Sequence, residues 1–221
     1  MFNFFKSKKK KVGLFLSGGA VRGIAHIGVL RAFEFFKYPI DIIYGTSSGA
    51  IIGSLYCAGM KAEQLIVIME TLSMREFIKF KLSRQALFSS EAIQLFVEKH
   101  IGKVTFRDLK IPLGVFVTNI QTGKAELIRD LDLDVSSYVR ASSSIPGVFT
   151  PTTLESKTYI DGAFGSDQDL NAFDCDIKIA CNAISEKPLQ TIPKTIPELV
   201  DRAAECLMIS KGYSQAHYYD L

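Results

Sequence analysis

Two short hydrophobic runs near the N-terminus each lead into a cluster of glycines and serines. Val12–Ser17 forms the first run, and Ile40–Tyr44 forms the second, which ends at Gly45. Continuous apolar runs of this length are typical of strands that are buried on both faces of a parallel sheet. The sequence therefore predicts two parallel strands, each followed by a glycine-rich turn.

Apolar residues recur at helical spacing after both turns and through the middle of the chain. Ile27, Leu30 and Phe33 mark one face of a helix over Ile24–Lys37. The other predicted helices are Ala50–Ala58, Lys61–Phe80, one capped by Ser89 or Ser90, Val135–Ser143 and Pro197–Lys211. The other predicted strands are Leu113–Ile120, Ala125–Arg129, Thr158–Ala163 (ending in an Asp-Gly turn) and Ile177–Asn182.

Length and composition indicate one globular domain with a short tail. The chain has 221 residues and is 48% hydrophobic, which is enough for one sizeable core over residues 12–221. It holds 26 basic and 23 acidic residues, and five of the lysines lie in Met1–Lys11. The positive excess therefore belongs to the tail, and a nucleic-acid-binding face is not indicated.

The tail Met1–Lys11 interleaves three phenylalanines with its lysines. This composition suits electrostatic attachment to anionic lipid with aromatic rings at the interface, and the alternative is a solvated terminus. The apolar run after the lysines is too short for the core of a signal peptide, and no other run reaches the roughly 18 residues of a membrane span. We therefore expect a cytoplasmic protein that can bind peripherally to a membrane.

The four cysteines do not form a metal or disulfide pattern. Cys57, Cys175, Cys181 and Cys206 contain no Cys-x-x-Cys pair and fall within apolar runs. We expect them to behave as small buried hydrophobic residues.

A Gly-x-Ser-x-Gly pattern, Gly45–Gly49, lies between the second predicted strand and the helix that follows it. In a nucleophile elbow, the serine occupies a sharp turn that exposes its Oγ at the end of the sheet. Glycines at both ends let the backbone pass the helix without a Cβ clash. A helix starting at Ser48 would also direct its positive end at Ser47, which favours developing negative charge. The pattern thus indicates Ser47 as a nucleophile.

The glycine-rich turn Gly18–Gly23 follows the first strand, and three functions compete for it. A phosphate-binding loop would end in Gly-Lys-Ser/Thr, which is absent. A dinucleotide fingerprint would need glycine at Ala20 and an acidic residue at the end of the next strand, whereas Asp41 precedes the core of that strand. The third function is an oxyanion hole, in which backbone N–H groups bind the charged oxygen of an acyl intermediate. Only this function explains why the loop should accompany a serine elbow on the next strand. Both turns follow parallel strands and therefore open at the same edge of the sheet.

Serine hydrolysis needs a base, and the histidines are poorly placed to supply it. His26 lies in the first helix, His100 ends a helix, and His217 lies near the C-terminus in a polar segment. A base on a frayed end would not be held within hydrogen-bonding reach of Ser47. This makes the Asp161-Gly162 turn worth considering, although Asp-Gly alone is only a turn signal.

The motifs Ser17–Gly23, Gly45–Gly49 and Asp161–Ala163, in this order, resemble those of the patatin-like phospholipases. The similarity extends to the segments Gly23–Glu34, Asp108–Thr118, Arg140–Phe149 and Tyr159–Ala163, and covers roughly residues 12–182. The resemblance implies a three-layer α/β/α fold around a mainly parallel sheet. It also implies hydrolysis of acyl esters in phospholipids, lysophospholipids or other lipids, with no metal and no cofactor.

The resemblance further implies a Ser-Asp dyad without histidine. In that scheme Ser47 is the nucleophile, Asp161 is the base, and the N–H groups of Gly18, Gly19 and Ala20 form the oxyanion hole. The supporting motif residues are Arg22, which braces the loop, with Gly23, Gly45, Gly49, Gly162 and Ala163. A carboxylate is an effective base for serine only in a water-poor site with strong stabilisation of the anionic intermediate.

The chain departs from the family pattern at three places. Ala20 occupies the position of the usual third glycine, and alanine at a positive φ costs energy. Ser48 replaces a usual alanine, and Ser166-Asp167-Gln168-Asp169 replaces an Asn-Pro-x-Pro-like segment. Two other interpretations therefore stay open. One is a Ser47–Asp161–His217 triad, whose chain order fits, and the other is a non-catalytic module that binds lipid or an anion.

Overall fold

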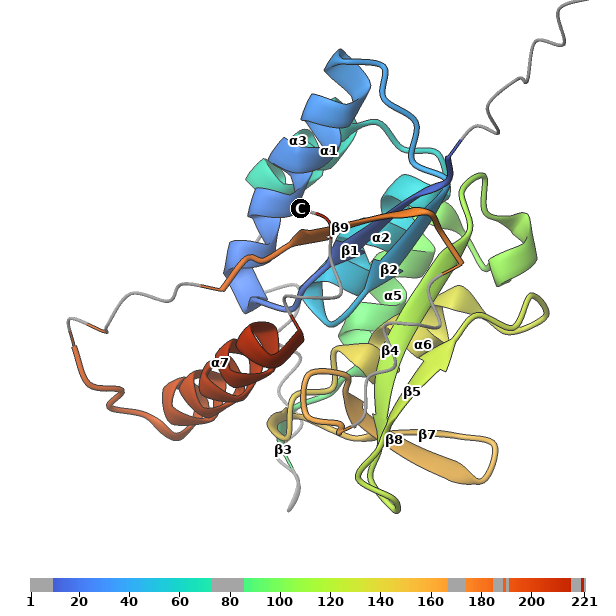
Figure 1. Cartoon of the computed structure of the whole chain (residues 1–221). Helices are drawn as coiled ribbons and strands as arrows, with labels where there is room; N and C mark the ends of the chain where they lie inside the picture. The colour runs from blue at the N-terminus through green and yellow to red at the C-terminus, as the bar shows by residue number, and fades with distance from the viewer. Residues whose placement is uncertain are drawn as a thin grey trace, which may run out of the picture.

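The computed structural model describes residues 10–72, 86–166, 174–184, 189, 191–215 and 220 (Figure 1). Several sequence expectations lie outside these residues: most of the Met1–Lys11 tail, the second half of the Lys61–Phe80 helix, Asp167–Asp169 and His217. Within the described part, no helix is both long and apolar enough to cross a membrane.

A seven-stranded mixed sheet organises the domain, in the order β7-β8-β4-β2-β1-β9 with β5 paired to β4. Its strands are β1 Val12–Leu16, β2 Ile42–Gly45, β4 Leu113–Asn119, β5 Ala125–Ile128, β7 Thr152–Leu154, β8 Lys157–Asp161 and β9 Ile177–Cys181. Strands β9, β1, β2 and β4 are parallel neighbours, whereas β5, β8 and β7 pair antiparallel. A separate pair is formed by β3 Ala86–Phe88 and β6 Gly147–Phe149.

The helices confirm the elements expected from the hydrophobic spacing, with shifted ends. They are α1 Ala25–Phe35, α2 Ser48–Cys57, α3 Ala62–Thr71, α5 Glu91–Ile101, α6 Val135–Ser142 and α7 Ile196–Gln215, with 3₁₀ turns η1 Ala20–Ile24 and η2 Phe106–Asp108. Helix α2 packs on β1, β2 and β4, while α5 and α6 pack beside it. Helix α7 contacts β6, and an ion pair between Arg22 and Glu205 joins it to η1.

The core divides along the sheet because successive side chains of a strand point to opposite faces. Leu14 and Leu16 face the main core, which also holds Ile43 and Val115. The intervening residue Phe15 packs instead in the second cluster, on the other face, around the buried residues Tyr44 and Phe116. Strands β1, β2 and β4 are therefore buried on both faces, as their continuous apolar runs predict.

The cysteines differ from the sequence expectation in their exposure. Cys57 is buried, but Cys175 and Cys181 are only partly buried and Cys206 is exposed on α7. The reason is that Cys206 lies outside the buried stripe of α7, which contains Ala204 and Glu205.

Candidate active site

Ser47 lies at the sharp turn between β2 and α2, where it is the N-cap residue of the helix. Its backbone has φ 53° and ψ −123°, a conformation that L-residues rarely adopt, and the residue is 5% exposed. Close packing explains the flanking glycines. A Cβ at Gly45 would lie 2.7 Å from the Ala50 Cα, and one at Gly49 would lie 2.1 Å from the Leu16 carbonyl oxygen. The turn therefore has the strand-to-helix geometry of a nucleophile elbow.

The glycine-rich loop lies directly beside this elbow. Leu16 pairs with Gly45 in the parallel ladder, and the Thr46 N–H donates to the Leu16 carbonyl at 3.1 Å. A Cβ at Gly23 would lie 2.4 Å from the Ser48 Oγ, so the two turns are in contact. The expected meeting of both turns at one sheet edge is therefore observed.

The loop has the backbone features that an anion site needs. Within the described ranges, the N–H groups of Gly18 and Gly19 donate no hydrogen bond. Ala20 has φ 48°, so the residue that replaces glycine does adopt a left-handed conformation. The loop's own carbonyl is held by Ser17, whose Oγ donates to the Gly18 oxygen at 2.7 Å.

Asp161 ends strand β8 and is 1% exposed. Its Oδ1 accepts a hydrogen bond from the Ala163 N–H at 2.9 Å, and its main-chain carbonyl accepts one from Thr118 Oγ1 at 2.7 Å. A Cβ at Gly162 would lie 2.2 Å from the Phe116 carbonyl oxygen, so only glycine fits there. Among the described residues, no hydrogen bond joins the Asp161 carboxylate to the Ser47 hydroxyl. Catalytic hydrogen bonds are often formed only in the substrate complex.

Ser142 links the elbow to the segment after β8, and the sequence reasoning missed it. Its Oγ accepts a hydrogen bond from the Ser47 N–H at 2.9 Å, while its carbonyl accepts one from the Gly162 N–H at 3.2 Å. It belongs to the Arg140–Phe149 segment, whose family resemblance was the only signal that could have drawn attention to it.

His26 is fully buried and contacts the loop without reaching the elbow. Its Nε2–H donates to the Ser17 carbonyl at 2.8 Å, and its Nδ1 accepts from the Cys181 thiol at 3.0 Å. Burial lowers the pKa of His26 more than the Ser17 hydrogen bond raises it, and burial raises the pKa of the Cys181 thiol. His26 is therefore a neutral structural support of the loop.

The other two histidines do not add a base within the described part of the chain. His100 uses its Nδ1–H to bond the Phe96 carbonyl within α5 at 2.8 Å. His217 lies outside the described residues. In those residues, no group of three or more histidine, cysteine or acidic side chains could hold a metal ion.

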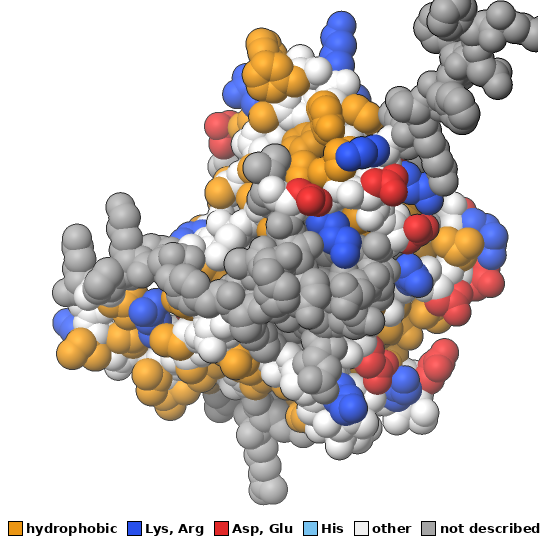
Figure 2. All heavy atoms as spheres, in the orientation of Figure 1, with side chains coloured by type: hydrophobic (Ala, Val, Ile, Leu, Met, Phe, Trp, Pro, Cys, Tyr) orange, Lys and Arg blue, Asp and Glu red, His pale blue; other side chains and the backbone are white. Residues whose placement is uncertain are grey.

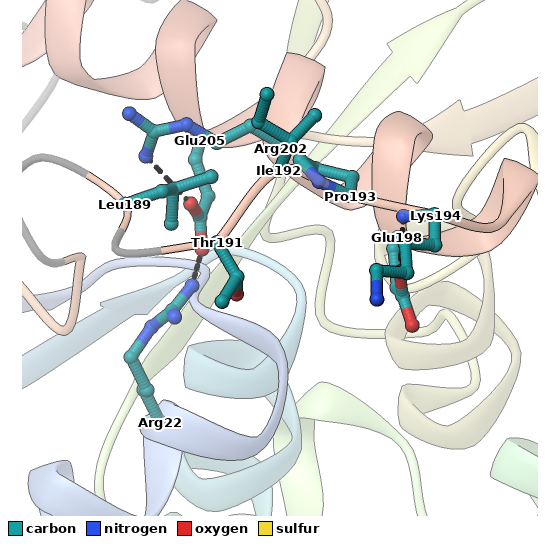
Figure 3. A pocket seen from close by; sticks show the side chains of 9 residues that line it. All are labelled: Arg22, Leu189, Thr191, Ile192, Pro193, Lys194, Glu198, Arg202 and Glu205. Carbon is teal, nitrogen blue, oxygen red and sulfur yellow. Dashed lines mark hydrogen bonds and ion pairs between the residues drawn. The ribbon is translucent and has the colours of Figure 1, made fainter.

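Arg22 connects the glycine loop to the C-terminal helix. Its guanidinium forms an ion pair with Glu205 of α7, and Arg202 bonds the other oxygen of the same carboxylate at 2.9 Å (Figure 3). The Glu205 residue is only 3% exposed. These three residues line a cavity of about 410 Å³, which Lys194 and Glu198 also line. Glu205 has no sequence signal, because an acidic residue in an amphipathic helix normally faces solvent.

Comparison with known proteins links most of the chain, including the Ser47 turn and Asp161, to one family. The family model described as patatin-like phospholipase matches residues 14–174. An uncharacterized NTE family protein of Mycobacterium bovis is 31% identical over 159 residues, which are 71% of this chain and 43% of that protein. Lysophospholipase NTE1 of Pyricularia oryzae is 30% identical over 161 residues, 70% of this chain and 11% of that protein. The chain thus spans less than half the length of each of these two relatives.

Solved structures with the same fold include two bacterial proteins. VipD from Legionella pneumophila superposes with a TM-score of 0.61 and 13% identity, over 78% of this chain and 50% of VipD. A chain of the SpcU–ExoU complex from Pseudomonas aeruginosa gives a TM-score of 0.55 and 13% identity, over 96% of this chain and 53% of that chain. At this identity the likeness concerns the fold alone, and it confirms the α/β class expected from the sequence.

Proposed function

This chain belongs to the patatin-like phospholipase family, and from that premise we propose that it is a serine hydrolase of lipid acyl esters. The observation that carries the proposal is the position of Ser47. It occupies a left-handed turn at the N-terminus of α2, in contact with a loop whose Gly18 and Gly19 N–H groups have no acceptor within the described residues. A nucleophile beside bare N–H donors is the arrangement that acyl transfer requires.

The proposed reaction uses Ser47 and Asp161 in two half-reactions. The Ser47 Oγ attacks the ester carbonyl as its proton passes to the Asp161 carboxylate, and the N–H groups of Gly18, Gly19 and Ala20 stabilise the resulting oxyanion. Collapse breaks the bond to the alcohol, which takes the proton from Asp161 and leaves an acyl-Ser47 ester. Water then attacks this ester with Asp161 again as the base, and the second intermediate collapses as Asp161 returns the proton to the Ser47 Oγ and free fatty acid is released.

The oxyanion loop should contribute as strongly as the dyad. Removal of one oxyanion donor typically costs about 3–4 kcal/mol of transition-state stabilisation. The positive end of α2 adds to this effect because Ser47 is the N-cap residue of that helix. No metal or cofactor has a role in this scheme.

The proposed substrate is a lysophospholipid or another lipid with one accessible acyl ester. The name of the fungal relative, lysophospholipase NTE1, supports this class. An apolar surface beside the cavity also suits a lipid partner: Ile192, Ile196 and Leu199 are 84%, 74% and 60% exposed. Figure 2 shows hydrophobic side chains gathered over α7 at the lower left. A second lipid contact through the basic residues of Met1–Lys11 is part of the same proposal.

Hydrolysis of a chromogenic acyl ester and of micellar lysophospholipid, together with labelling by a fluorophosphonate, tests the proposal. The matched set is the wild type, Ser47→Ala, Asp161→Asn and His217→Ala. We expect labelling at Ser47 in the wild type, and loss of turnover by at least about a thousandfold in the first two variants. Full activity of His217→Ala removes the triad interpretation.

Two results would contradict the proposal. Turnover that survives in Ser47→Ala would place the nucleophile elsewhere. A wild type that neither turns over nor labels, but binds lysophospholipid micelles, would instead support the non-catalytic lipid-binding module.

A further inference from the structure

Ser142 is the last residue of α6 and is completely buried, between the elbow and strand β4. Its hydroxyl donates to the Phe116 carbonyl at 2.6 Å. Since the single hydroxyl proton is used there, the hydroxyl oxygen is left as an acceptor, and it accepts from the Ser47 N–H at 2.9 Å. The side chain of Ser142 therefore fastens the backbone of the nucleophile to the central strand.

The main chain around Ser142 fastens the other half of the dyad. The Ser142 carbonyl accepts from the Gly162 N–H at 3.2 Å, and the Ser144 carbonyl accepts from the Asp161 N–H at 3.0 Å. Phe116 is shared by both halves, because its carbonyl oxygen contacts the Ser142 hydroxyl and lies against Gly162. One residue thus contacts the elbow through its side chain and the segment after Asp161 through its backbone.

The elbow needs such a constraint. The φ of 53° at Ser47 is a sparsely populated conformation, which persists only where the surrounding structure fixes it. The Ser47 carbonyl is fixed by the first turn of α2, where it accepts from the Ala50 and Ile51 N–H groups. The Ser47 N–H is fixed by Ser142 alone among the described residues.

We propose that Ser142 is a positioning residue, which sets the placement of the Ser47 hydroxyl relative to Asp161. The proposal rests on the hydrolase function argued above. Loss of the Ser142 hydroxyl would free the strained turn to relax and would leave the Ser47 N–H buried without its acceptor. A shift of about 1 Å in a catalytic group can lower the rate a hundredfold, so the effect should fall on kcat.

The test compares Ser142→Ala with Ser136→Ala. Ser136 lies on the same helix, is 1% exposed, and its hydroxyl contacts the Asp134 and Glu98 carboxylates at 2.7 and 3.1 Å, away from the elbow. We expect Ser142→Ala to lower kcat and the rate of fluorophosphonate labelling by about 10- to 100-fold, with KM changed by less than about twofold. Ser136→Ala should keep the wild-type kcat even if it lowers the melting temperature as much as Ser142→Ala does.

A second variant, Ser142→Cys, keeps the test open if Ser142→Ala does not fold. The thiol keeps a hydrogen-bonding group at this position, but sulfur is larger than oxygen and is a weaker acceptor, so the contacts to Ser47 and Phe116 should lengthen and kcat should fall below that of the wild type. Wild-type kcat in either folded Ser142 variant, or an equal loss of kcat in Ser136→Ala, would overturn the positioning role.

Amide hydrogen exchange separates this proposal from the hydrolase function. Even if the wild type has no turnover, the Ser47 amide should exchange at least about tenfold faster in Ser142→Ala than in Ser136→Ala. Equal protection of that amide in both variants would show that Ser142 does not hold the elbow, whatever the activity.

Discussion

The Arg22 guanidinium, two residues beyond Ala20, forms an ion pair with the buried Glu205 carboxylate of α7 (Figure 3). Arg202 bonds the same carboxylate, so one acidic side chain lies between two arginines. Glu205 lies beyond residue 174, where the match to the family ends. The C-terminal helix is therefore mechanically connected to the loop that we propose as the oxyanion hole.

Glu205→Gln should weaken this connection. The arginines would lose their buried counter-charge, and we expect the free energy of unfolding to fall by about 1–3 kcal/mol, less than for a fully buried pair because the Arg22 side chain is 43% exposed. We also expect kcat to fall about tenfold as the loop loses its fixed geometry. Denaturant titration and ester hydrolysis measure the two effects.

Glu198→Gln is the matched control for that change. Glu198 lines the same cavity on the same helix, but it is exposed, and its carboxylate accepts from the Lys194 and Thr195 N–H groups at 2.7 and 3.2 Å. Its kcat should stay within about twofold of the wild type. An equal loss of rate in both variants would mean that Glu205 acts through the helix as a whole and not through Arg22.

Ala20→Gly should stabilise the protein. A left-handed conformation costs an L-residue about 1–2 kcal/mol, and the extra freedom of glycine in the unfolded chain offsets about 0.5–1 kcal/mol of the relief. We expect the free energy of unfolding to rise by about 0.5–1 kcal/mol, with activity at least equal to that of the wild type. A lower melting temperature would mean that the Ala20 methyl group makes contacts that outweigh the strain.

Gly49→Ala should destroy the elbow. The added methyl group would lie 2.1 Å from the Leu16 carbonyl oxygen, so strand β1 and helix α2 would have to separate. We expect loss of fluorophosphonate labelling and a destabilisation of at least about 2 kcal/mol.

Gly28→Ala is the matched control for Gly49→Ala, and here we expect the same substitution to stabilise the protein. Gly28 lies within α1, and a Cβ added there would meet no atom within 4 Å, so alanine should stabilise the helix by about 0.5–1 kcal/mol. A higher melting temperature for Gly49→Ala than for Gly28→Ala would contradict the close packing of Gly49 against the Leu16 carbonyl.

His26 should make folding sensitive to mild acid. Burial lowers its pKa in the folded protein below the ordinary value of 6.5, so the unfolded chain binds a proton more readily than the folded chain does. Its contribution to stability is therefore complete above pH 6.5 and is lost as pH falls toward the lowered pKa, by at most about 1.4 kcal/mol per pH unit.

Denaturant titration of the wild type and His26→Gln between pH 7.5 and 5 measures that dependence. The slope of the unfolding free energy against pH should be smaller in the variant. An identical slope in the two proteins would show that other groups account for the acid sensitivity.

Several parts of the candidate site could be predicted from short stretches of sequence. The apolar runs predict strands β1 and β2, and the glycines around Ser47 predict the turn between β2 and α2, because steric limits on a few consecutive residues decide such features. The parallel arrangement of the two strands then brings both turns to one edge of the sheet. Assignment of Asp161, by contrast, depended on family resemblance, since an Asp-Gly pair alone predicts only a turn.

Tertiary structure alone decided which distant residues hold the site together. Ser142 bonds the backbone of a serine 95 residues away, and Glu205 reaches Arg22 from the last described helix. No sequence pattern predicts either contact. In the sequence alone, Ser142 and Glu205 cannot be told apart from the exposed polar residues of amphipathic helices, because their burial and partners depend on tertiary packing. The sequence by itself thus determined the turns and their residue types, whereas the packing of α6 and α7 determined how those turns are held.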